Sequence, residues 1–155
     1  MKFQTATATL LLLPALAWAA TKRADTWGGS VSLGPTRSTI TNAVTTLIPG
    51  AAPATQNGVL FLWPGMSNGT GDLVQTTLES WASNEWCGAE QGEWCVRASL
   101  FGSFGQLDGD AAPVKGDDQV RIEYVLLEDG DTWLQYVLPS FSYFSIVLVL
   151  LLLLV

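Results

Sequence analysis

Residues 26–137 contain no segment in which apolar residues recur at the helical period over three turns. Short apolar runs instead alternate with Gly, Pro, Asn and Asp, which are the residues that favour turns. This pattern predicts strands near residues 27–33, 38–48, 58–63, 72–79, 94–101, 118–127 and 132–137. Short strands separated in this way are typical of all-β proteins, and we predict an antiparallel β-sandwich.

The segment VRIEYVL, which begins at Val120, shows the strand pattern most clearly. Its apolar residues occupy alternate positions, and Arg121 and Glu123 fall between them, as in a strand with one buried face. Asp129-Gly130 follows and predicts a hairpin turn, because Gly tolerates the positive φ that such turns need. The same kind of dipeptide predicts further turns at Asn57-Gly58, Asn68-Gly69 and Asp108-Gly109.

The first 19 residues have the three parts of a secretion signal. Lys2 supplies the basic start, Leu10–Leu13 the apolar middle, and Ala17-Trp18-Ala19 the small residues of a cleavage site. We therefore predict a signal peptide over residues 1–19, a short N-terminal or pro segment over 20–25, and a secreted protein.

Residues 138–155 form an apolar tail without charged residues. Counted from Val137 the run is 19 residues long, close to the ~20 that span a bilayer as a helix. The tail is thus a transmembrane candidate that would tether the protein to a membrane, although the Lys or Arg that ordinarily flanks such a helix is absent. The alternative is a translated intron, because Gln135-Tyr136-Val137 can be encoded by a string that resembles a splice donor. Both interpretations stay open.

Net charge and the absence of histidine exclude several classes of function. Residues 24–137 hold all 14 acidic residues and only four basic ones, so their net charge is −10. Such a surface repels phosphate, and we predict no nucleic-acid binding. Without histidine, Ser-His-Asp, Cys-His and histidine-zinc sites are excluded, and proton transfer falls to groups such as carboxyls at acidic pH. The acidic clusters do not match a calcium-binding loop, so we expect neither metal nor cofactor.

Cys87 and Cys95 are the only cysteines of this predicted secreted chain, so we expect them to form a structural disulfide. It would hold a tryptophan-rich loop against the start of a strand. Asn68-Gly69-Thr70 is a sequon for N-glycosylation in a predicted turn, and Asn68 is the expected attachment site.

In the strand predicted over 72–79, the alternation places Gln75 and Glu79 on one face. Together with Trp63 of a neighbouring strand they would form an aromatic and polar binding surface, whereas the alternative is an ordinary solvated face. Exposed tryptophans such as Trp86 would stack on sugar rings, and the alternative for them is packing in the core.

Four segments of this region occur in the order Trp27-Gly28-Gly29-Ser30-Val31, STITNAVTTLIPG, LFLWPG and DLVQTTLES. In this order they resemble the start of the fungal glutamic peptidases, the eqolisins, and the resemblance covers roughly residues 26–137. It implies a concanavalin A-like jelly roll in which a Gln and a Glu on one sheet activate water at acidic pH. Gln75 corresponds to the catalytic Gln, so an active protein would be an acid endopeptidase that acts on polypeptides.

The chain departs from this family in two places. No residue matches the catalytic Glu, because the sequence becomes apolar after Val137, and Trp63-Pro64-Gly65 differs from the family's W-x-G-hydrophobic-D pattern. We therefore expect a truncated sandwich over residues 26–137 that is inactive in this form. The chain is also similar to secreted fungal lectin/glucanase-like proteins. This gives the alternative function, a carbohydrate-binding module that contacts polysaccharide through Trp63, Glu79 and Trp86.

Overall fold

The structure is a computed structural model that describes residues 26–140 and the backbone of residues 147–152. The predicted signal peptide over 1–19 and the segment over 20–25 lie outside the described residues. Residues up to Pro35 and residues from Thr36 onward form separate compact units. The sheets described below belong to the second unit.

The strand predicted near residues 27–33 is wrong, because residues 26–35, which belong to the first unit, contain neither helix nor strand. Gly28 and Gly29 weaken any strand here, because they lose more backbone entropy than other residues and offer no side chain to pack. Val31 and Leu33 are more than nine-tenths exposed, so the apolar alternation that suggested a strand has no buried face.

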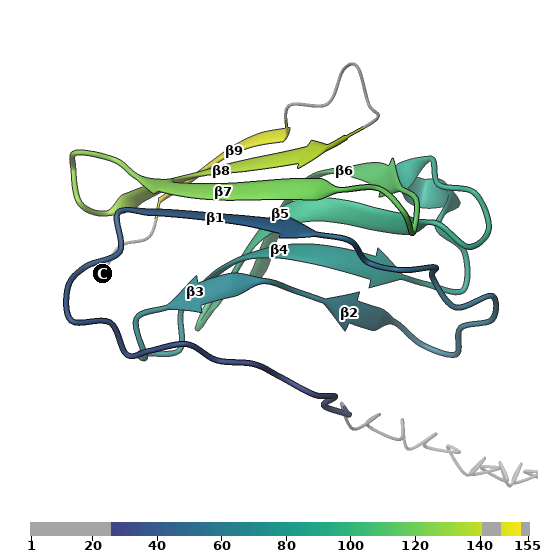
Figure 1. The fold of residues 1–155 in the computed structure, drawn as a ribbon, viewed down its shortest axis with the longest axis horizontal. Helices are drawn as coiled ribbons and strands as arrows, with labels where there is room; N and C mark the ends of the chain where they lie inside the picture. The colour runs from purple at the N-terminus through teal and green to yellow at the C-terminus, as the bar shows by residue number, and fades with distance from the viewer. Residues whose placement is uncertain (1–25, 141–146, 153–155) are drawn as a thin grey trace, which may run out of the picture. The chain divides into compact units, whose positions relative to one another are not determined.

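Sheet A is antiparallel, with the strand order β1-β7-β8-β9 (Figure 1). Its strands are β1 (Asn42–Leu47), β7 (Val120–Leu126), β8 (Thr132–Pro139) and β9 (Val147–Leu152). The predicted Asp129-Gly130 turn joins β7 to β8, and Gly130 has a φ of 78°. The Thr132 hydroxyl donates a hydrogen bond to the Asp129 carboxylate and is the largest cause of the lowered pKa of Asp129. Backbone N–H groups of Asp131 and Thr132 donate to the same carboxylate, which fixes the turn.

Sheet B is also antiparallel and has the order β2-β4-β5-β6, with β3 pairing β4 as well. Its strands are β2 (Leu60–Leu62), β3 (Gly65–Ser67), β4 (Leu73–Ser80), β5 (Trp94–Gly102) and β6 (Gly105–Val114). Pro64 separates β2 from β3 along the edge of the sheet, where its missing N–H is tolerated. Its carbonyl still accepts a hydrogen bond of 3.1 Å from the backbone N–H of Thr76 in β4.

The two sheets lie in two layers and enclose one apolar core (Figure 1). The core residues come from alternate positions of both sheets, including Val74, Leu78, Val96, Ala98, Leu100, Val120, Ile122, Tyr124 and Val137. Two polar side chains of sheet A cross this core. The Tyr124 hydroxyl bonds to Thr76 Oγ1 at 3.0 Å, and Gln135 Nε2 donates to the carbonyl of Ser99 at 3.1 Å. The predicted all-β architecture with two antiparallel sheets is thereby confirmed.

Strand β6 was not predicted, and the predicted turn at Asp108-Gly109 is wrong because both residues lie inside this strand. Its sequence, GQLDGDAAPV, contains Gly, Asp and Pro, which favour turns. β6 nevertheless pairs with β5 in spite of these preferences. The register of the two strands shifts between Arg97 and Ser99, which marks a local irregularity in the pairing. As the edge strand of the sheet, β6 also tolerates Pro113.

The apolar tail contributes strand β9, which pairs antiparallel with β8. Residues 147–152 of the transmembrane candidate therefore form a strand and not a helix. Across the part of the chain that the structure describes, no helix is both long and apolar enough to cross a membrane.

Candidate functional site

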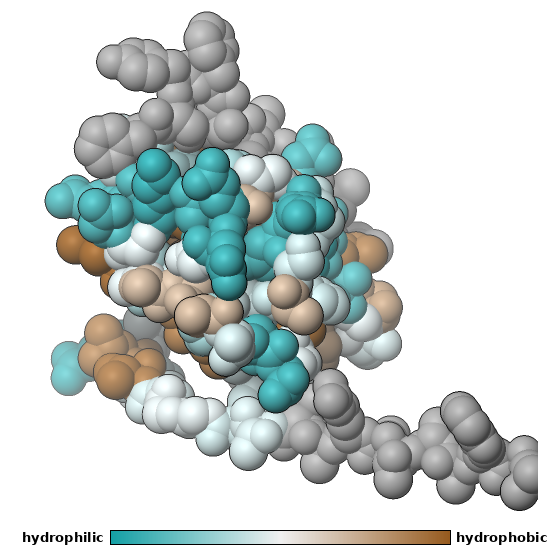
Figure 2. Space-filling model, turned by 90° about the vertical axis from the view of Figure 1, so that its right-hand side faces the viewer, coloured by the Kyte–Doolittle hydropathy of each residue, from teal (hydrophilic) through white to brown (hydrophobic). Residues whose placement is uncertain are grey.

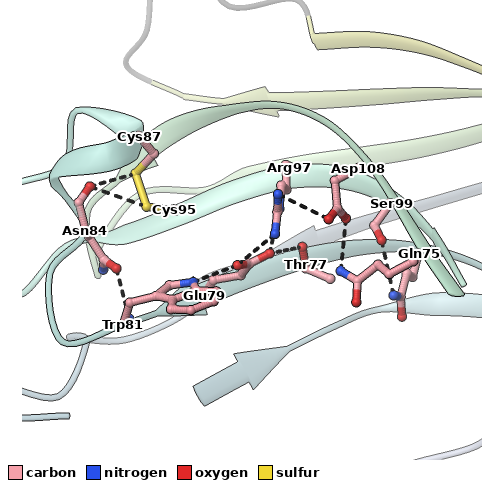
Figure 3. Close-up of polar contacts among 11 residues, drawn as sticks. Gln75, Thr77, Glu79, Trp81, Asn84, Cys87, Cys95, Arg97, Ser99 and Asp108 are labelled. Atoms are coloured by element: carbon pink, nitrogen blue, oxygen red, sulfur yellow. Dashed lines mark hydrogen bonds and ion pairs between the residues drawn. A yellow bond between two sulfur atoms is a disulfide. The ribbon is translucent and has the colours of Figure 1, made fainter. Parts of the chain in front are cut away.

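The face of sheet B that points away from sheet A carries a continuous set of polar side chains (Figure 3). It arises from the alternation of β4, which sends Val74, Thr76 and Leu78 toward the core and the residues between them to the other side. Cross-strand pairing adds side chains from β5 and β6 to the same side. We call this set the polar face; its members are Gln75, Thr77, Glu79, Arg97, Ser99 and Asp108.

Glu79 is the most constrained member of the polar face, because its side chain has no exposed surface. Its Oε1 accepts hydrogen bonds from the Thr77 hydroxyl at 2.9 Å and from Arg97 Nε at 2.7 Å. Its Oε2 accepts from Arg97 Nη2 at 3.1 Å and from Trp81 Nε1 at 2.8 Å. This bidentate, charge-assisted pair satisfies a carboxylate that would be very costly to bury alone.

Arg97 lies at the centre of the polar face, and its guanidinium contacts the side chains of Glu79, Asp108 and Trp86. Its Nη1 is 3.1 Å from Asp108 Oδ2, so the guanidinium pairs with a second carboxylate in addition to Glu79. Its Cζ also lies 5.2 Å from the centre of the Trp86 ring, within the range of a cation–π interaction. Arg97 therefore connects the buried carboxylate to an aromatic surface.

Trp81 and Trp86, which we call the aromatic corner, lie at the end of the polar face. Trp81 follows β4 directly, and Trp86 belongs to the short 3-10 helix η1 (Glu85–Cys87). Their ring centres are 6.3 Å apart and their planes are inclined at 79°, so the rings meet edge to face. The two residues are 40% and 48% exposed, which leaves much of both indoles open to a ligand.

The loop that carries the aromatic corner is held in several places. Cys87 and Cys95 form the predicted disulfide, which ties η1 to the start of β5. Asn84 Oδ1 accepts a hydrogen bond of 2.9 Å from the Trp81 backbone N–H, and its Nδ2 donates to the carbonyl of Glu93 at 2.7 Å. The tryptophans are thus presented from a braced loop, and Figure 3 shows Trp81 with the disulfide and Asn84.

Gln75 lies on the polar face as predicted but has little access to solvent, since it is only 5% exposed. Its Nε2 donates a hydrogen bond of 3.3 Å to the hydroxyl of Ser99, its cross-strand neighbour. Gly65 of β3 pairs with Gln75, and a Cβ at Gly65 would lie 2.8 Å from the backbone carbonyl oxygen of Val74, so only glycine permits this close approach. In the next strand Asp108 pairs with Ser99, so the amide, hydroxyl and carboxylate occupy one row across the sheet.

Two further predicted site residues, Trp63 and Asn68, lie in the connections before and after β3. Trp63 occupies the break between β2 and β3 at the sheet edge and is 42% exposed. Asn68 is in the exposed turn before β4, so it lies at the opposite end of that strand from Trp81. Its Oδ1 accepts hydrogen bonds from the backbone N–H and the hydroxyl of Thr70, at 2.9 and 2.6 Å.

Sequence reasoning missed Arg97, although one signal pointed to it. Arg97 is the only basic residue of the strand predicted over 94–101, in a region with a large excess of acidic residues. A single cation in a strand with apolar neighbours indicates a buried ion pair. Its partner depends on the pairing of β4 with β5, which places Arg97 opposite Thr77, two residues along β4 from Glu79.

Among the described residues, no group of three acidic, cysteine or histidine side chains is arranged to hold a metal ion. Comparison of the chain with protein-family models, with curated proteins and with solved structures finds no match.

Proposed function

We propose that the protein is a secreted carbohydrate-binding β-sandwich of the concanavalin A-like jelly-roll type, similar in architecture to the glutamic peptidases but without their catalysis. One observation carries this proposal. The fully buried Glu79 uses both oxygens to hold Arg97 and Trp81, and thereby fixes two half-exposed indoles at the end of the polar face.

Indoles suit carbohydrates because their large flat rings pack against the apolar faces of sugars while neighbouring polar groups bond to hydroxyls. The aromatic corner offers such rings, and the partly exposed Asp108 lies beyond Arg97 on the same face. The partner is therefore a polysaccharide, and the loop disulfide and a glycan on Asn68 fit a secreted protein.

Hydrolysis is disfavoured by the state of Gln75, which the family resemblance selects, and of Glu79, the carboxylate on the same strand. An amide such as Gln75 has no useful pKa and can only orient or polarise a reacting group. The carboxylate on its own strand, Glu79, is enclosed by hydrogen bonds and an ion pair, so water cannot reach it. We therefore assign Glu79 to positioning the aromatic corner.

Acid proteolysis stays as the second candidate function because of the row formed by Gln75, Ser99 and Asp108. In this row an amide and a partly exposed carboxylate flank one hydroxyl on the same face, so Asp108 would act in place of the missing Glu. Hydrolysis of a denatured protein substrate at acidic pH tests it. Activity that is lost in both Gln75→Ala and Asp108→Asn would support the second candidate over the first.

A glycan array followed by isothermal titration tests the proposed carbohydrate binding. We expect Trp86→Ala to weaken the Kd about tenfold, because it removes a stacking surface worth about 1 kcal/mol or more. Phe104→Ala is the matched control, since Phe104 is an equally exposed aromatic residue in the turn between β5 and β6. Equal Kd values for both variants and the wild type would contradict the proposed site.

A further inference from the structure

We infer that the aromatic corner binds a single chain of an uncharged glycan and does not bind the flat surface of a crystalline polysaccharide. This inference rests on the proposed function and specifies its ligand. Its first support is the 79° angle between the planes of Trp81 and Trp86. Two rings at nearly right angles cannot both lie flat on one plane, whereas one narrow chain can lie along the outer surface of the corner that they form.

The two rings are not free to become coplanar. The indole N–H of Trp81 donates to Glu79, and the backbone N–H of Trp81 donates to Asn84, so rotation of this ring would break a bond to a buried carboxylate. Trp86 is next to the disulfide-bonded Cys87 and packs against the guanidinium of Arg97. The corner is therefore preorganised, and preorganised sites favour ligands that match their existing shape.

The charge around the corner selects against acidic glycans. Arg97 is the only cation of the polar face, and two carboxylates, Glu79 and Asp108, already pair with it. Glu85, Glu90 and Glu93 lie in the loop that presents the tryptophans. Figure 2 views the molecule from the end at which β4 and β6 terminate, and hydrophilic side chains gather on its upper part. A uronic acid or sulfated chain would bring more negative charge into this acidic surface.

The experiment compares three kinds of probe with the full chain. Soluble hexaoses of the cello, laminari, chito and manno series represent single neutral chains, microcrystalline cellulose and crystalline chitin represent flat surfaces, and polygalacturonate represents an acidic chain. We expect at least one hexaose to bind and quench tryptophan fluorescence, with at least tenfold weaker binding in Trp81→Ala and Trp86→Ala. Neither the crystalline polymers nor polygalacturonate should bind.

Adsorption to a crystalline polymer without binding of any hexaose would overturn the inference but leave the proposed function intact. Binding of polygalacturonate would likewise overturn the inference and leave the proposed function intact. No binding to any probe would instead remove the proposed function and this inference with it. Trp86→Phe distinguishes a lost stacking surface from a misfolded loop. It keeps an aromatic ring beside Arg97, so it should recover most of the affinity that Trp86→Ala loses.

Discussion

Two arginine–glutamate pairs on opposite sheets have the same shortest distance but very different surroundings. In sheet B, Arg97 lies 2.7 Å from Glu79, and the two side chains are 19% and 0% exposed. In sheet A, Arg121 lies 2.7 Å from Glu123, and these side chains are 44% and 23% exposed. The distance between the charges is therefore a poor guide to what each pair contributes, because burial sets both the desolvation cost and the strength of the interaction.

The largest expected effect follows from breaking the buried pair. Arg97→Met leaves Glu79 charged, buried and without its partner, and we expect the free energy of unfolding to fall by about 3–5 kcal/mol. Arg121→Met is the matched control, because water readily solvates the Glu123 that it leaves behind, and its unfolding should be close to that of the wild type. Urea denaturation of both variants measures the difference.

The double variant Arg97→Met/Glu79→Gln sharpens this test. It removes the unpaired charge and should recover part of the stability that Arg97→Met alone loses. Equal, small losses in Arg97→Met and Arg121→Met would contradict the claim that burial separates the two pairs.

This contrast also explains how much of the molecule the sequence could predict. The alternation in VRIEYVL correctly placed Arg121 and Glu123 on the outside of β7, because neighbours two positions apart on one strand share a face whatever that strand pairs with. The alternation of β4 placed Gln75 and Glu79 together for the same reason. Short-range periodicity therefore sufficed for both faces.

The contacts between strands needed information that a single sequence does not carry. The Arg97–Glu79 pair depends on the register of β4 against β5, which follows from the packing of both sheets. Asp108 joined the polar face only because β6 forms a strand in spite of its turn-favouring residues. The segment 27–33 failed in the opposite way, because its alternation had no partner strand and no buried face.

The second prediction extends the comparison to the two faces of β7, where Tyr124 follows Glu123 in the sequence. Burial, as the largest cause, raises the pKa of Tyr124, whose hydroxyl bonds to Thr76 Oγ1. The folded state therefore keeps its proton at a pH where the unfolded state has lost it. Stability from this group is fully present below the ordinary tyrosine pKa of about 10 and falls as the pH rises above that value, by up to about 1.4 kcal/mol per pH unit.

Tyr124→Phe tests this expectation. The variant loses the hydrogen bonds of the buried hydroxyl to the Pro64 carbonyl and to Thr76 Oγ1, of 2.9 and 3.0 Å, which should cost about 1–3 kcal/mol near neutral pH. Its stability should nevertheless decline less steeply than that of the wild type above about pH 10. Thermal unfolding between pH 8 and about pH 11 measures both slopes. If the stability of the two proteins declined equally steeply with rising pH, Tyr124 would not be the cause of the loss of stability at alkaline pH.

The smallest expected effect concerns the exposed Arg121–Glu123 pair. It distinguishes the influence of a hydrogen bond on the pKa of Glu123 from the influence of a nearby charge. The pKa of Glu123 is lowered first by the hydrogen bond from Asn42 Nδ2 to Oε1, of 3.1 Å, and next by the hydrogen bond from Arg121 to Oε2. A lowered folded-state pKa means that the group stabilises the protein above the ordinary glutamate pKa of about 4.3 and that this contribution disappears as the pH falls through the folded value.

We expect Asn42→Ala and Arg121→Met each to raise the pKa of Glu123, as measured by NMR titration of its carboxyl carbon. Asn57→Ala, at an exposed position outside the strands, is the control and should leave the titration unchanged. In high salt the coulombic share of the Arg121 effect should shrink because ions screen exposed charges, whereas the Asn42 effect should persist because a hydrogen bond from a neutral amide is screened far less. If high salt reduced the Asn42 effect as much as the Arg121 effect, charge would control the exposed pair after all. The difference from the buried pair would then lie only in how strongly the two charges interact.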